Sequence, residues 1–337
     1  MTWLVTGGAG YIGAHVVRAL AAAGMSPVVI DDLSSGHREF VPQDVPLVHG
    51  SILDFTLVAR TLREHEVEGV IHVAGYKYAG VSVRRPLHTY AQNVEGTRIV
   101  LEAMQQADVV DLVFSSSAAV YGTPDVPLVT EDLPKRPASP YGESKLIGEW
   151  LIGDQAVATA EGGRPLRHTS LRYFNVVGSG DPSVYDTSPH NLFPIVFEKL
   201  IAGETPRING DDYDTPDGTN VRDYVHVADI AAAHVVAAQR LAAGLPVAPA
   251  YNLGSNNGLS VREIMDAMAR VTGIPFTPEI GPRRPGDPDR IVATGELAAR
   301  DLDWRNRYTV DEMVTSVVTA RSPSASKSCR TVVRGGR

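Results

Sequence analysis

Cysteine is almost absent from this chain of 337 residues, which contains only Cys329. A single cysteine excludes an internal disulfide framework and a thiolate metal cluster. No group of His, Asp and Glu residues has metal-ligand spacing either. This cysteine usage fits a reducing compartment, so we expect a cytoplasmic protein without a metal site.

Long apolar runs and leader features are missing as well. The N-terminus has no basic stretch followed by an apolar one, so we predict no signal peptide. The most apolar long stretch, residues 230–245, is interrupted by His234, Gln239 and Arg240. That pattern indicates an amphipathic or buried helix rather than a membrane span.

Neither sign of charge is concentrated in a long block. The chain has 31 Lys and Arg residues against 39 Asp and Glu, which gives a net charge of −8. This balance argues against a nucleic acid or an anionic membrane as the main partner. We expect a small molecule instead.

Short apolar runs alternate with helical patterns through the first half of the chain. We expect strands at residues 3–6, 27–30, 47–49, 70–74, 112–115 and 169–174, and helices at 12–23, 56–65, 94–105 and 141–160. Strands that are apolar on both faces and alternate with helices form a parallel sheet covered on both sides. The predicted fold class is therefore α/β, with a doubly wound parallel Rossmann sheet.

The pattern changes after Phe174. Residues 178–189 and 203–219 are rich in Gly, Pro, Asp and Ser, which predicts long loops around a helix near 192–202. Residues 225–241 have the pattern of another strand followed by a helix. We expect a Rossmann domain over residues 1–174 and a smaller α/β domain over 175–321, which returns to the first near 225–245. Residues 322–337 lack periodicity and predict a disordered tail.

A glycine loop, Gly7-Gly8-Ala9-Gly10-Tyr11-Ile12-Gly13, lies between the first strand and the first helix. Gly7 permits a tight turn, Gly10 lets the backbone approach a pyrophosphate, and Gly13 lets helix and strand pack closely. The unpaired N–H groups of the helix N-terminus would then face the phosphates. A glycine-rich turn without a ligand is the alternative, but the position directly after the first strand favours a dinucleotide site.

Asp31 ends the second predicted strand, 24 residues after Gly7. A carboxylate at this point accepts hydrogen bonds from the adenosine ribose and repels a 2′-phosphate, so it favours NAD over NADP. The alternative is an aspartate that only stabilises the turn at residues 31–36.

Tyr141 and Lys145 are four residues apart and share one face of a helix, which Ser139 and Pro140 start as N-cap and first-turn residues. Upstream, a strand that ends in Ser117 delivers hydroxyl groups to the carboxyl edge of the sheet, where such sheets bind ligands. A surface Tyr–Lys pair at helical spacing is the alternative. The order of glycine loop, serine strand and Tyr–Lys pair favours a catalytic group.

The Tyr141 phenol is the expected base for a substrate hydroxyl that loses its proton while hydride leaves the same carbon. A free tyrosine has a pKa of about 10. Lys145 and the positive charge of an oxidised nicotinamide are expected to lower the pKa of Tyr141 towards neutrality. Ser117 is expected to hold the substrate oxygen and to relay the proton.

The ordered set of glycine loop, acidic residue, Ser-Ser-Ser-Ala and Tyr-x-x-x-Lys resembles the extended short-chain dehydrogenase/reductase family. Finer motifs resemble the UDP-glucose (UDP-galactose) 4-epimerases of that family. They are HVAGYK at 72–77, NVEGT at 93–97, VYG at 120–122, LRYFN at 171–175, NLFP at 191–194, DGT at 217–219, VRDYVHV at 221–227 and RRPGD at 283–287. The resemblance extends from residue 1 to about residue 318.

This resemblance implies an NAD-dependent enzyme that inverts C4 of a UDP-hexose, with NAD in the first domain and the UDP-sugar in the second. It implies that Ser117, Tyr141 and Lys145 are catalytic. The cofactor-binding residues it implies are Gly7, Gly10, Tyr11, Ile12, Gly13, Asp31, Asp32, Leu33, Ser34, Ser51, Ile52, Val73, Ala74, Gly75, Lys77, Asn93 and Phe174. The substrate-binding residues it implies are Lys77, Ser117, Tyr141, Asn175, Asn191, Leu192, Arg222, Arg284, Asp287 and Ile291.

Two of the substrate-binding residues, Arg222 and Arg284, suit a diphosphate because planar guanidinium groups pair with phosphate oxygens. Ile291 occupies the position whose bulk in this family limits access for a 2-acetamido group, and it is stiff at its β-branch. Two positions depart from the family pattern. Ser51 replaces a common aspartate, and Val81 replaces a common glutamate beside the sugar.

In the reaction that the resemblance implies, Tyr141 takes the 4-hydroxyl proton and C4 gives hydride to NAD. The 4-keto sugar rotates while UDP stays bound, and hydride returns to the opposite face. One alternative is a 4,6-dehydratase, which needs an acid–base pair where this chain has Ala118 and Ala119. Epimerisation of UDP-N-acetylhexoses or UDP-pentoses and a non-catalytic NAD-binding regulator are further alternatives. The resemblance also implies a homodimer that forms through a helical face.

Overall fold

The structure, a computed structural model, describes residues 1–284 and 287–321; the predicted tail at 322–337 lies outside this range. Its largest feature is a seven-stranded sheet in which every neighbouring pair is parallel. The strands, in spatial order, are β11 (Ala250–Leu253), β6 (Arg167–Tyr173), β5 (Asp111–Ser117), β4 (Gly69–His72), β1 (Thr2–Thr6), β2 (Ser26–Asp31) and β3 (Leu47–His49). The predicted doubly wound α/β fold is confirmed.

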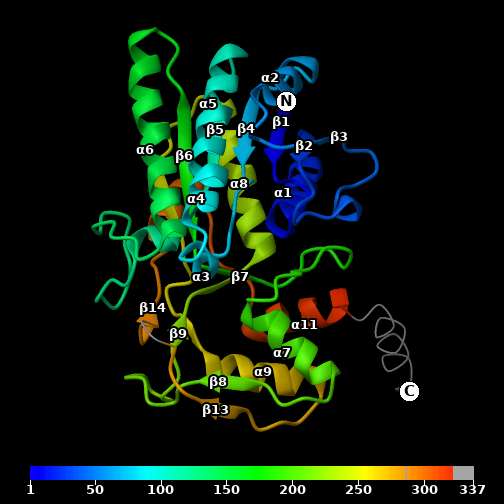
Figure 1. The fold of residues 1–337 in the computed structure, drawn as a ribbon, viewed down its shortest axis with the longest axis vertical. Helices are drawn as coiled ribbons and strands as arrows, with labels where there is room; N and C mark the ends of the chain where they lie inside the picture. The colour runs from blue at the N-terminus through cyan, green and yellow to red at the C-terminus, as the bar shows by residue number, and fades with distance from the viewer. Residues whose placement is uncertain (285–286, 322–337) are drawn as a thin grey trace.

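Helices cover both faces of this sheet (Figure 1). They are α1 (Tyr11–Ala22) and α8 (Val227–Ala242) on one face, and α2 (Phe55–Glu64), α5 (Gly96–Gln106) and α6 (Pro140–Glu161) on the other. Each face has its own apolar core: Trp3 and Leu20 lie in one, and Leu62 and Phe114 in the other. Burial on both faces explains why the strands read as continuous apolar runs.

Helix α6 shows how the sequence sets the start of an element. The Ser139 hydroxyl accepts a hydrogen bond from Gly142 N at 3.3 Å, and Pro140 occupies the first turn, where no backbone donor is needed. This cap fixes the first turn of the helix that contains Tyr141.

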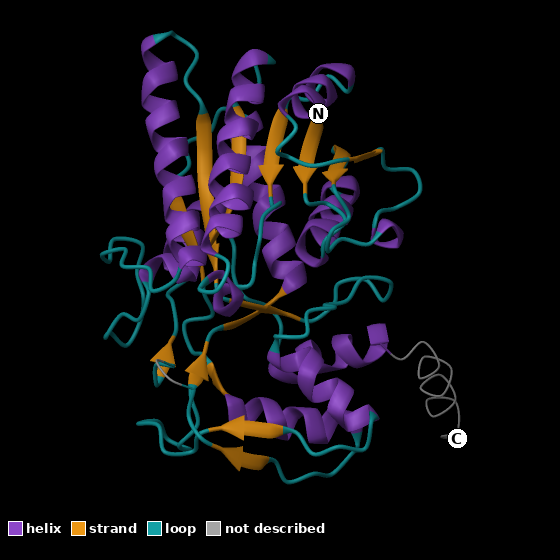
Figure 2. Ribbon diagram, in the orientation of Figure 1, coloured by secondary structure: helices purple, strands orange, loops and turns teal. Residues whose placement is uncertain are grey.

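A second unit lies below the sheet in Figure 2, and the arrowheads of the sheet strands point towards it. Its strands are β7 (Asn175–Val177) with β10 (Tyr224–His226), β9 (Val221–Arg222) with β12 (Leu259–Ser260) and β14 (Arg290–Ile291), and β8 (Arg207–Asn209) with β13 (Glu279–Gly281). Its helices are α7 (Leu192–Ile201), α9 (Val261–Thr272) and α11 (Val310–Arg321), which share one apolar core, and α10 (Glu296–Leu302), which packs near α8 and β11.

The chain returns from the second unit to the sheet, as the pattern at residues 225–241 predicts. After β10 it forms α8, which packs on α1 and β5, and then adds β11 to the edge of the sheet beside β6. The carboxyl ends of the sheet strands therefore face the second unit across one shared space. This arrangement places the ends of β1, β2, β4 and β5 where a ligand can meet both units.

Short helical elements fill the connections. They are α3 (Ala79–Ser82), α4 (Pro86–Tyr90), a π-helical turn (Ala91–Glu95) that runs into α5, and two 3₁₀ turns (Arg38–Phe40 and Ala118–Tyr121). Among the described residues, no helix is both long and apolar enough to cross a membrane.

Candidate active site

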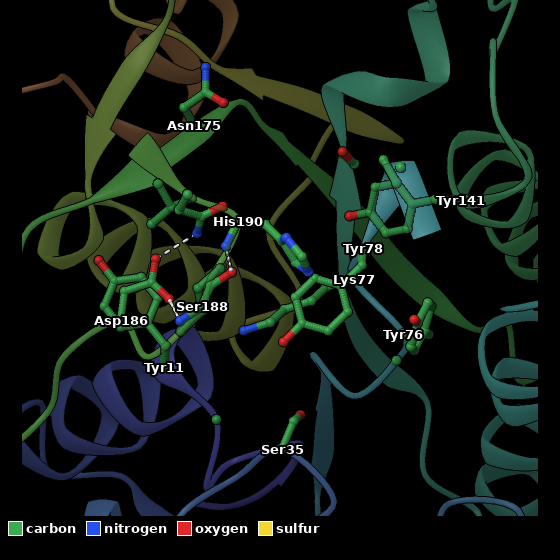
Figure 3. Close-up of a pocket in the computed structure, with 18 of the residues that line it drawn as sticks. Tyr11, Ser35, Tyr76, Lys77, Tyr78, Tyr141, Asn175, Asp186, Ser188 and His190 are labelled. Carbon is green, nitrogen blue, oxygen red and sulfur yellow. Dashed lines mark hydrogen bonds between the residues drawn. The ribbon is translucent and has the colours of Figure 1, made fainter. Parts of the chain in front are cut away.

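A cavity of about 1280 Å³ separates the carboxyl edge of the sheet from the second unit. Pockets for a single small ligand usually enclose roughly 300–1,000 Å³, so this space can hold two. Figure 3 shows residues of both units around it. One end is lined by the glycine loop and Asp31, the middle by Ser117 and Tyr141, and the other end by Arg222 and Arg284.

The glycine loop has the geometry that its sequence predicts. Gly7 has a φ of +70°, and a Cβ there would lie 2.8 Å from the Ala74 backbone. A Cβ on Gly13 would overlap the Gly7 carbonyl oxygen. Each glycine is needed because the turn or the close packing leaves no room for a side chain.

The N-terminus of α1 is open to the cavity. No side chain caps it at Gly10, and its first turn contains no acidic residue. Gly10, Tyr11 and Ile12 line the cavity directly. Uncapped N–H groups at the positive end of a helix form a ready site for a phosphate group.

Asp31 lies at the carboxyl end of β2 and is 8% exposed. Its carboxylate accepts hydrogen bonds from the backbone N–H groups of Ala9 and Leu33, both at 2.9 Å. Burial raises the pKa of Asp31, and the two backbone donors act in the opposite direction. Asp31 therefore stabilises its turn and also lines the cavity, so the two interpretations of this residue are compatible.

The tight glycine turn and the uncapped N-terminus of α1 fit the phosphates of a dinucleotide. The Asp31 carboxylate lines the cavity at the end of β2, and no cation from the neighbouring positions 32–36 balances it. The residues present thus suit a cofactor with free ribose hydroxyls rather than a 2′-phosphate.

Tyr141, Ser117 and Lys145 meet in the middle of the cavity. Tyr141 lies at the start of α6 and Ser117 at the end of β5, where the Ser117 hydroxyl accepts a hydrogen bond from Ala119 N at 3.2 Å. The Lys145 ammonium, one turn after Tyr141, donates to the Ser115 carbonyl oxygen at 2.8 Å and lies 5.0 Å from the centre of the Phe114 ring. The structure brings the three groups together in one cavity, as predicted.

Burial dominates the electrostatics of this group. It lowers the pKa of Lys145 to about 8, with Glu149 acting in the opposite direction. It also raises the pKa of Tyr141 above its ordinary value, and the nearby Ser117 hydroxyl only partly offsets this. In the protein alone the pKa of Tyr141 is therefore raised, and the lowering of that pKa by Lys145 together with a bound, positively charged nicotinamide stays a prediction.

Charged side chains of the second unit line the opposite end of the cavity. Arg222 forms an ion pair with Asp287, which also accepts from Asn220 Nδ2 at 3.0 Å. The side-chain oxygen of Asn209, in its favoured amide orientation, accepts from Arg284 at 3.2 Å. Fixed guanidinium groups at this end suit a diphosphate.

Most of the predicted site residues line the cavity. Besides those named above, they are Asp32, Ser34, Ile52, Val73, Gly75, Lys77, Phe174, Asn175, Asn191 and Leu192. Asn191 Nδ2 donates to the Asp186 carboxylate at 2.5 Å, so its side chain is held in place before any ligand binds.

Four residues that were predicted to contact a ligand are absent from the cavity lining. Leu33 packs against the core beneath α1 and has a φ of +57°. Ser51 turns its hydroxyl back to accept from Leu53 N at 3.1 Å. Asn93 is buried in the π-helical turn and bonds to the Tyr76 backbone and to Ser144 Oγ. Local hydrogen bonds therefore occupy the Ser51 hydroxyl and the Asn93 side chain, which were predicted to contact NAD.

Ile291 is the fourth, and its role as a gate stays a prediction. β14 pairs with β9 so that Ile291 stands opposite Arg222, and the side chain packs against the cluster that contains Tyr121 and Leu146. Phe174, which lines the cavity, packs against the same cluster. Ile291 therefore lies close to the cavity lining.

The structure also adds cavity residues that the sequence reasoning missed. They are Tyr76, Tyr78, His88, Asp186, Ser188, His190, Lys199, Arg207, Asn209 and Asn220. The i, i+2 spacing of Arg207 and Asn209 around buried Ile208 is the one signal that places two of them on the same strand face.

The family model described as the NAD dependent epimerase/dehydratase family matches residues 3–254. The chain belongs to this family. It is 42% identical to a UDP-glucose 4-epimerase of Lactobacillus helveticus over 321 residues, which cover 94% of this chain and 96% of the relative.

Solved structures of the family agree in fold over nearly the whole chain. A UDP-glucose 4-epimerase from Stenotrophomonas maltophila, with bound NAD and formylated UDP-arabinopyranose, aligns with a TM-score of 0.89 at 36% identity and covers 97% of this chain and 99% of its own. One from Bifidobacterium longum, in complex with NAD+ and UDP, gives a TM-score of 0.86 at 34% identity, covering 96% and 99%. The cofactor of this family member is NAD.

Proposed function

We propose that this chain interconverts UDP-galactose and UDP-glucose by inverting C4 of the hexose. The observation that carries the proposal is that Tyr141, Ser117 and Lys145 line the same cavity as the glycine loop and a cluster of guanidinium groups. The names of the relatives, which are UDP-glucose 4-epimerases, support it.

In this proposal NAD, when bound, supplies the acceptor for the C4 hydride and the positive charge of its nicotinamide. Tyr141 takes the proton of the 4-hydroxyl, and Ser117 holds the same oxygen. Lys145 stabilises the ionised form of Tyr141 by its charge. The burial that raises the pKa of Tyr141 in the protein alone also excludes water from the proton that it moves.

The remaining proposed roles follow from the position of each residue on the cavity wall. The glycine loop and Asp31 bind the dinucleotide. Asn191, Arg222 and Arg284 hold the UDP moiety, and Asp287 orients Arg222 through their ion pair. A firm hold on UDP lets the sugar turn within the middle of the cavity without leaving it.

Epimerisation of a UDP-pentose is the second candidate, because the Stenotrophomonas maltophila relative was solved with formylated UDP-arabinopyranose. A 4,6-dehydratase is disfavoured, since Ala118 and Ala119 supply no acid–base pair after Ser117. A non-catalytic regulator is disfavoured by the presence of both Tyr141 and Lys145.

We further propose a cytoplasmic homodimer. The single cysteine fits the compartment. The surface where α4 contacts α6 exposes Leu87, Trp150 and Val157, which are 83%, 59% and 66% exposed. Large exposed apolar side chains on neighbouring helices are typical of an interface, so light scattering should give twice the chain mass for the wild type and a lower mass for Trp150→Glu.

The function is tested by incubating the purified protein with UDP-galactose and separating the nucleotide sugars. We expect UDP-glucose to accumulate until the two sugars reach a constant ratio from either direction. A 4-keto-6-deoxy product would indicate the dehydratase instead, and an unchanged substrate would contradict the proposal.

A further inference from the structure

A buried ion pair begins one helical turn after Lys145 and does not line the cavity. The Arg172 guanidinium of β6 donates two hydrogen bonds to the Glu149 carboxylate of α6, at 2.8 and 2.5 Å. The two side chains are only 6% and 10% exposed. A buried pair of charges is seldom retained for stability alone, because the cost of desolvation offsets the attraction.

Glu149 and Lys145 bind consecutive residues of β5. Lys145 Nζ donates to the Ser115 carbonyl oxygen at 2.8 Å, and Glu149 Oε1 accepts from Ser116 Oγ at 2.5 Å. The next residue, Ser117, lines the cavity. Helix α6 lies alongside β5 and β6 (Figure 1), so Glu149 joins all three elements. Its bonds therefore fix the position of α6 along β5, and with it the position of Lys145.

The ion pair is also held from its far side. Arg172 Nη1 donates to Tyr121 Oη at 2.7 Å, and Tyr121 Oη donates to Asn252 Oδ1 at 2.8 Å. Asn252 lies in β11, and its backbone N–H donates to the Glu131 carboxylate at 2.8 Å. These bonds fix the guanidinium group, so Glu149 has a partner that keeps its carboxylate in place.

Lys145 needs a nearby negative charge because burial disfavours its charged form. Burial lowers the pKa of Lys145 to about 8, and the Glu149 carboxylate acts in the opposite direction. A carboxylate about one helical turn away raises the pKa of an ammonium group by about 1 to 2, at an effective dielectric constant of about 20. Glu149 therefore offsets part of the desolvation of Lys145.

Other titratable side chains reach this region from the neighbouring elements. They are His72 of β4, His168 and Tyr173 of β6, His234 of α8 and Lys135 of the segment before α6. Burial lowers the pKa of the three histidines and raises that of Tyr173, so these four are neutral near pH 8. Burial also lowers the pKa of Lys135, so a test must separate the charge of Lys135 from that of Lys145.

We propose that Glu149 is a positioning residue, which keeps Lys145 charged and fixed beside Tyr141 so that Lys145 stabilises the ionised phenol. This inference rests on the proposed epimerase function. Ser116 and Arg172 serve it by holding the carboxylate. The three groups of α6 are spaced at intervals of four residues, so one face of the helix carries the base, the cation and the anion that supports the cation.

The test follows the charge of Lys145 by carbon-13 NMR of protein labelled at lysine Cε. The chain has five lysines, and comparison with Lys145→Arg identifies the signal. We expect the titration midpoint in Glu149→Gln to lie about 1 to 2 pH units below that of the wild type, because the supporting charge is lost. The basic limb of the kcat/KM profile for UDP-galactose should move to lower pH by a similar amount, since neutral Lys145 no longer stabilises ionised Tyr141.

Asp111→Asn is the matched control. Arg167 donates to Asp111 at 2.7 Å and joins the same strands, β5 and β6, at the end remote from the cavity. This variant should lose stability and keep the wild-type midpoint and basic limb. Glu149→Gln leaves Arg172 as an unpaired buried cation, which destabilises the fold. The double variant Glu149→Gln/Arg172→Gln removes that cation, so it should regain stability in urea unfolding while its midpoint stays lowered.

An unchanged midpoint in Glu149→Gln and in the double variant would overturn the inference and leave the ion pair as a structural contact. A lowered midpoint without a shift of the basic limb would overturn it too, as would an equal shift in Asp111→Asn. A wild type that does not convert UDP-galactose would contradict the proposed function instead. In that case the NMR midpoints still decide whether Glu149 keeps Lys145 charged.

Discussion

At the scale of single residues, the environment of Tyr141 disfavours the ionised phenol that the proposed reaction needs. Burial raises the pKa of the phenol, while Ser117 favours the ionised form, and Lys145 is itself destabilised as a cation by the same burial. Three polar groups kept in a desolvated site cost stability, so the arrangement points to chemistry rather than to packing.

Tyr141→Phe removes the phenolic oxygen and little of the packing. We expect kcat to fall by about 10²–10⁴-fold, the usual contribution of a positioned acid–base group, while the variant still binds UDP-glucose. Steady-state kinetics and calorimetric binding on the same preparation check both parts. Turnover near the wild-type rate would assign the proton transfer to another group.

The Asp31 carboxylate is expected to set the preference of the protein for NAD over NADP. We expect the supernatant of denatured wild-type protein to contain NAD in excess of NADP, as measured by mass spectrometry. Asp31→Ser should narrow this preference because it removes the charge that repels a 2′-phosphate. Predominant NADP in the wild-type protein would refute the role of Asp31.

At the scale of elements, six of the seven sheet strands could be predicted because they are apolar runs, and the helices between them because they are long enough to show their period; β11 was not predicted. The strands that end at Asp31 and Ser117 and the helices that start at Tyr11 and Pro140 lie within two residues of their predicted bounds. Strands of two or three residues, such as β9 and β14, show no period at all. Their pairing places Ile291 opposite Arg222, and only the folded chain contains that information.

The segment between β4 and α5 was missed for a related reason. The short helix α3 and the π-helical turn are held by tertiary bonds from Ser82 to Tyr141 and from Asn93 to Tyr76, not by local periodicity. The aromatic contact of Tyr78 with His190 joins positions 112 residues apart, which spacing along the chain cannot predict.

The phosphate-binding turn should be the element least tolerant of a single added methyl group. In Gly13→Ala the new Cβ would overlap the Gly7 carbonyl oxygen, so we expect loss of bound NAD and destabilisation of about 1–3 kcal/mol, typical of overpacking. Gly153→Ala in α6 is the matched control, because its Cβ would meet no atom within 4 Å. That variant should retain NAD and gain up to about 1 kcal/mol from helix propensity. Equal behaviour of the two variants in thermal unfolding and NAD content would contradict the assignment.

At the scale of the whole molecule, buried histidines lie within and between the two units. His15 on α1 accepts from Gly180 N of the second unit at 2.9 Å. His226 stacks on Tyr308 within the second unit, with ring centroids 3.8 Å apart. His234 on α8 bonds to Ser115 of β5. We propose that residues 1–174 together with α8 and β11 form the NAD-binding unit, and that the rest of 175–321 forms the substrate unit.

These contacts make stability depend on pH. Burial lowers the pKa of His15, His226 and His234 to about 4 and that of His72 to about 3. Below pH 6.5 the unfolded chain binds protons that the folded chain does not, so the free energy of unfolding falls as pH falls from 6.5 towards 4. Between pH 7 and pH 5.5 the four residues should together cost about 5 kcal/mol, at about 1.4 kcal/mol per pH unit each. Urea unfolding at the two pH values measures this, and equal stabilities would show that the imidazoles are not buried as neutral groups.

The claim that both units serve one reaction at C4 is tested most directly with UDP-galactose deuterated at C4. The account predicts that the purified protein forms UDP-glucose that still carries the deuterium at C4, because the hydrogen leaves and returns within the closed cavity. The product should be analysed by mass spectrometry and proton NMR after a single incubation in ordinary water. UDP-glucose without the label would show that the C4 hydrogen exchanges with solvent, and this would contradict the account.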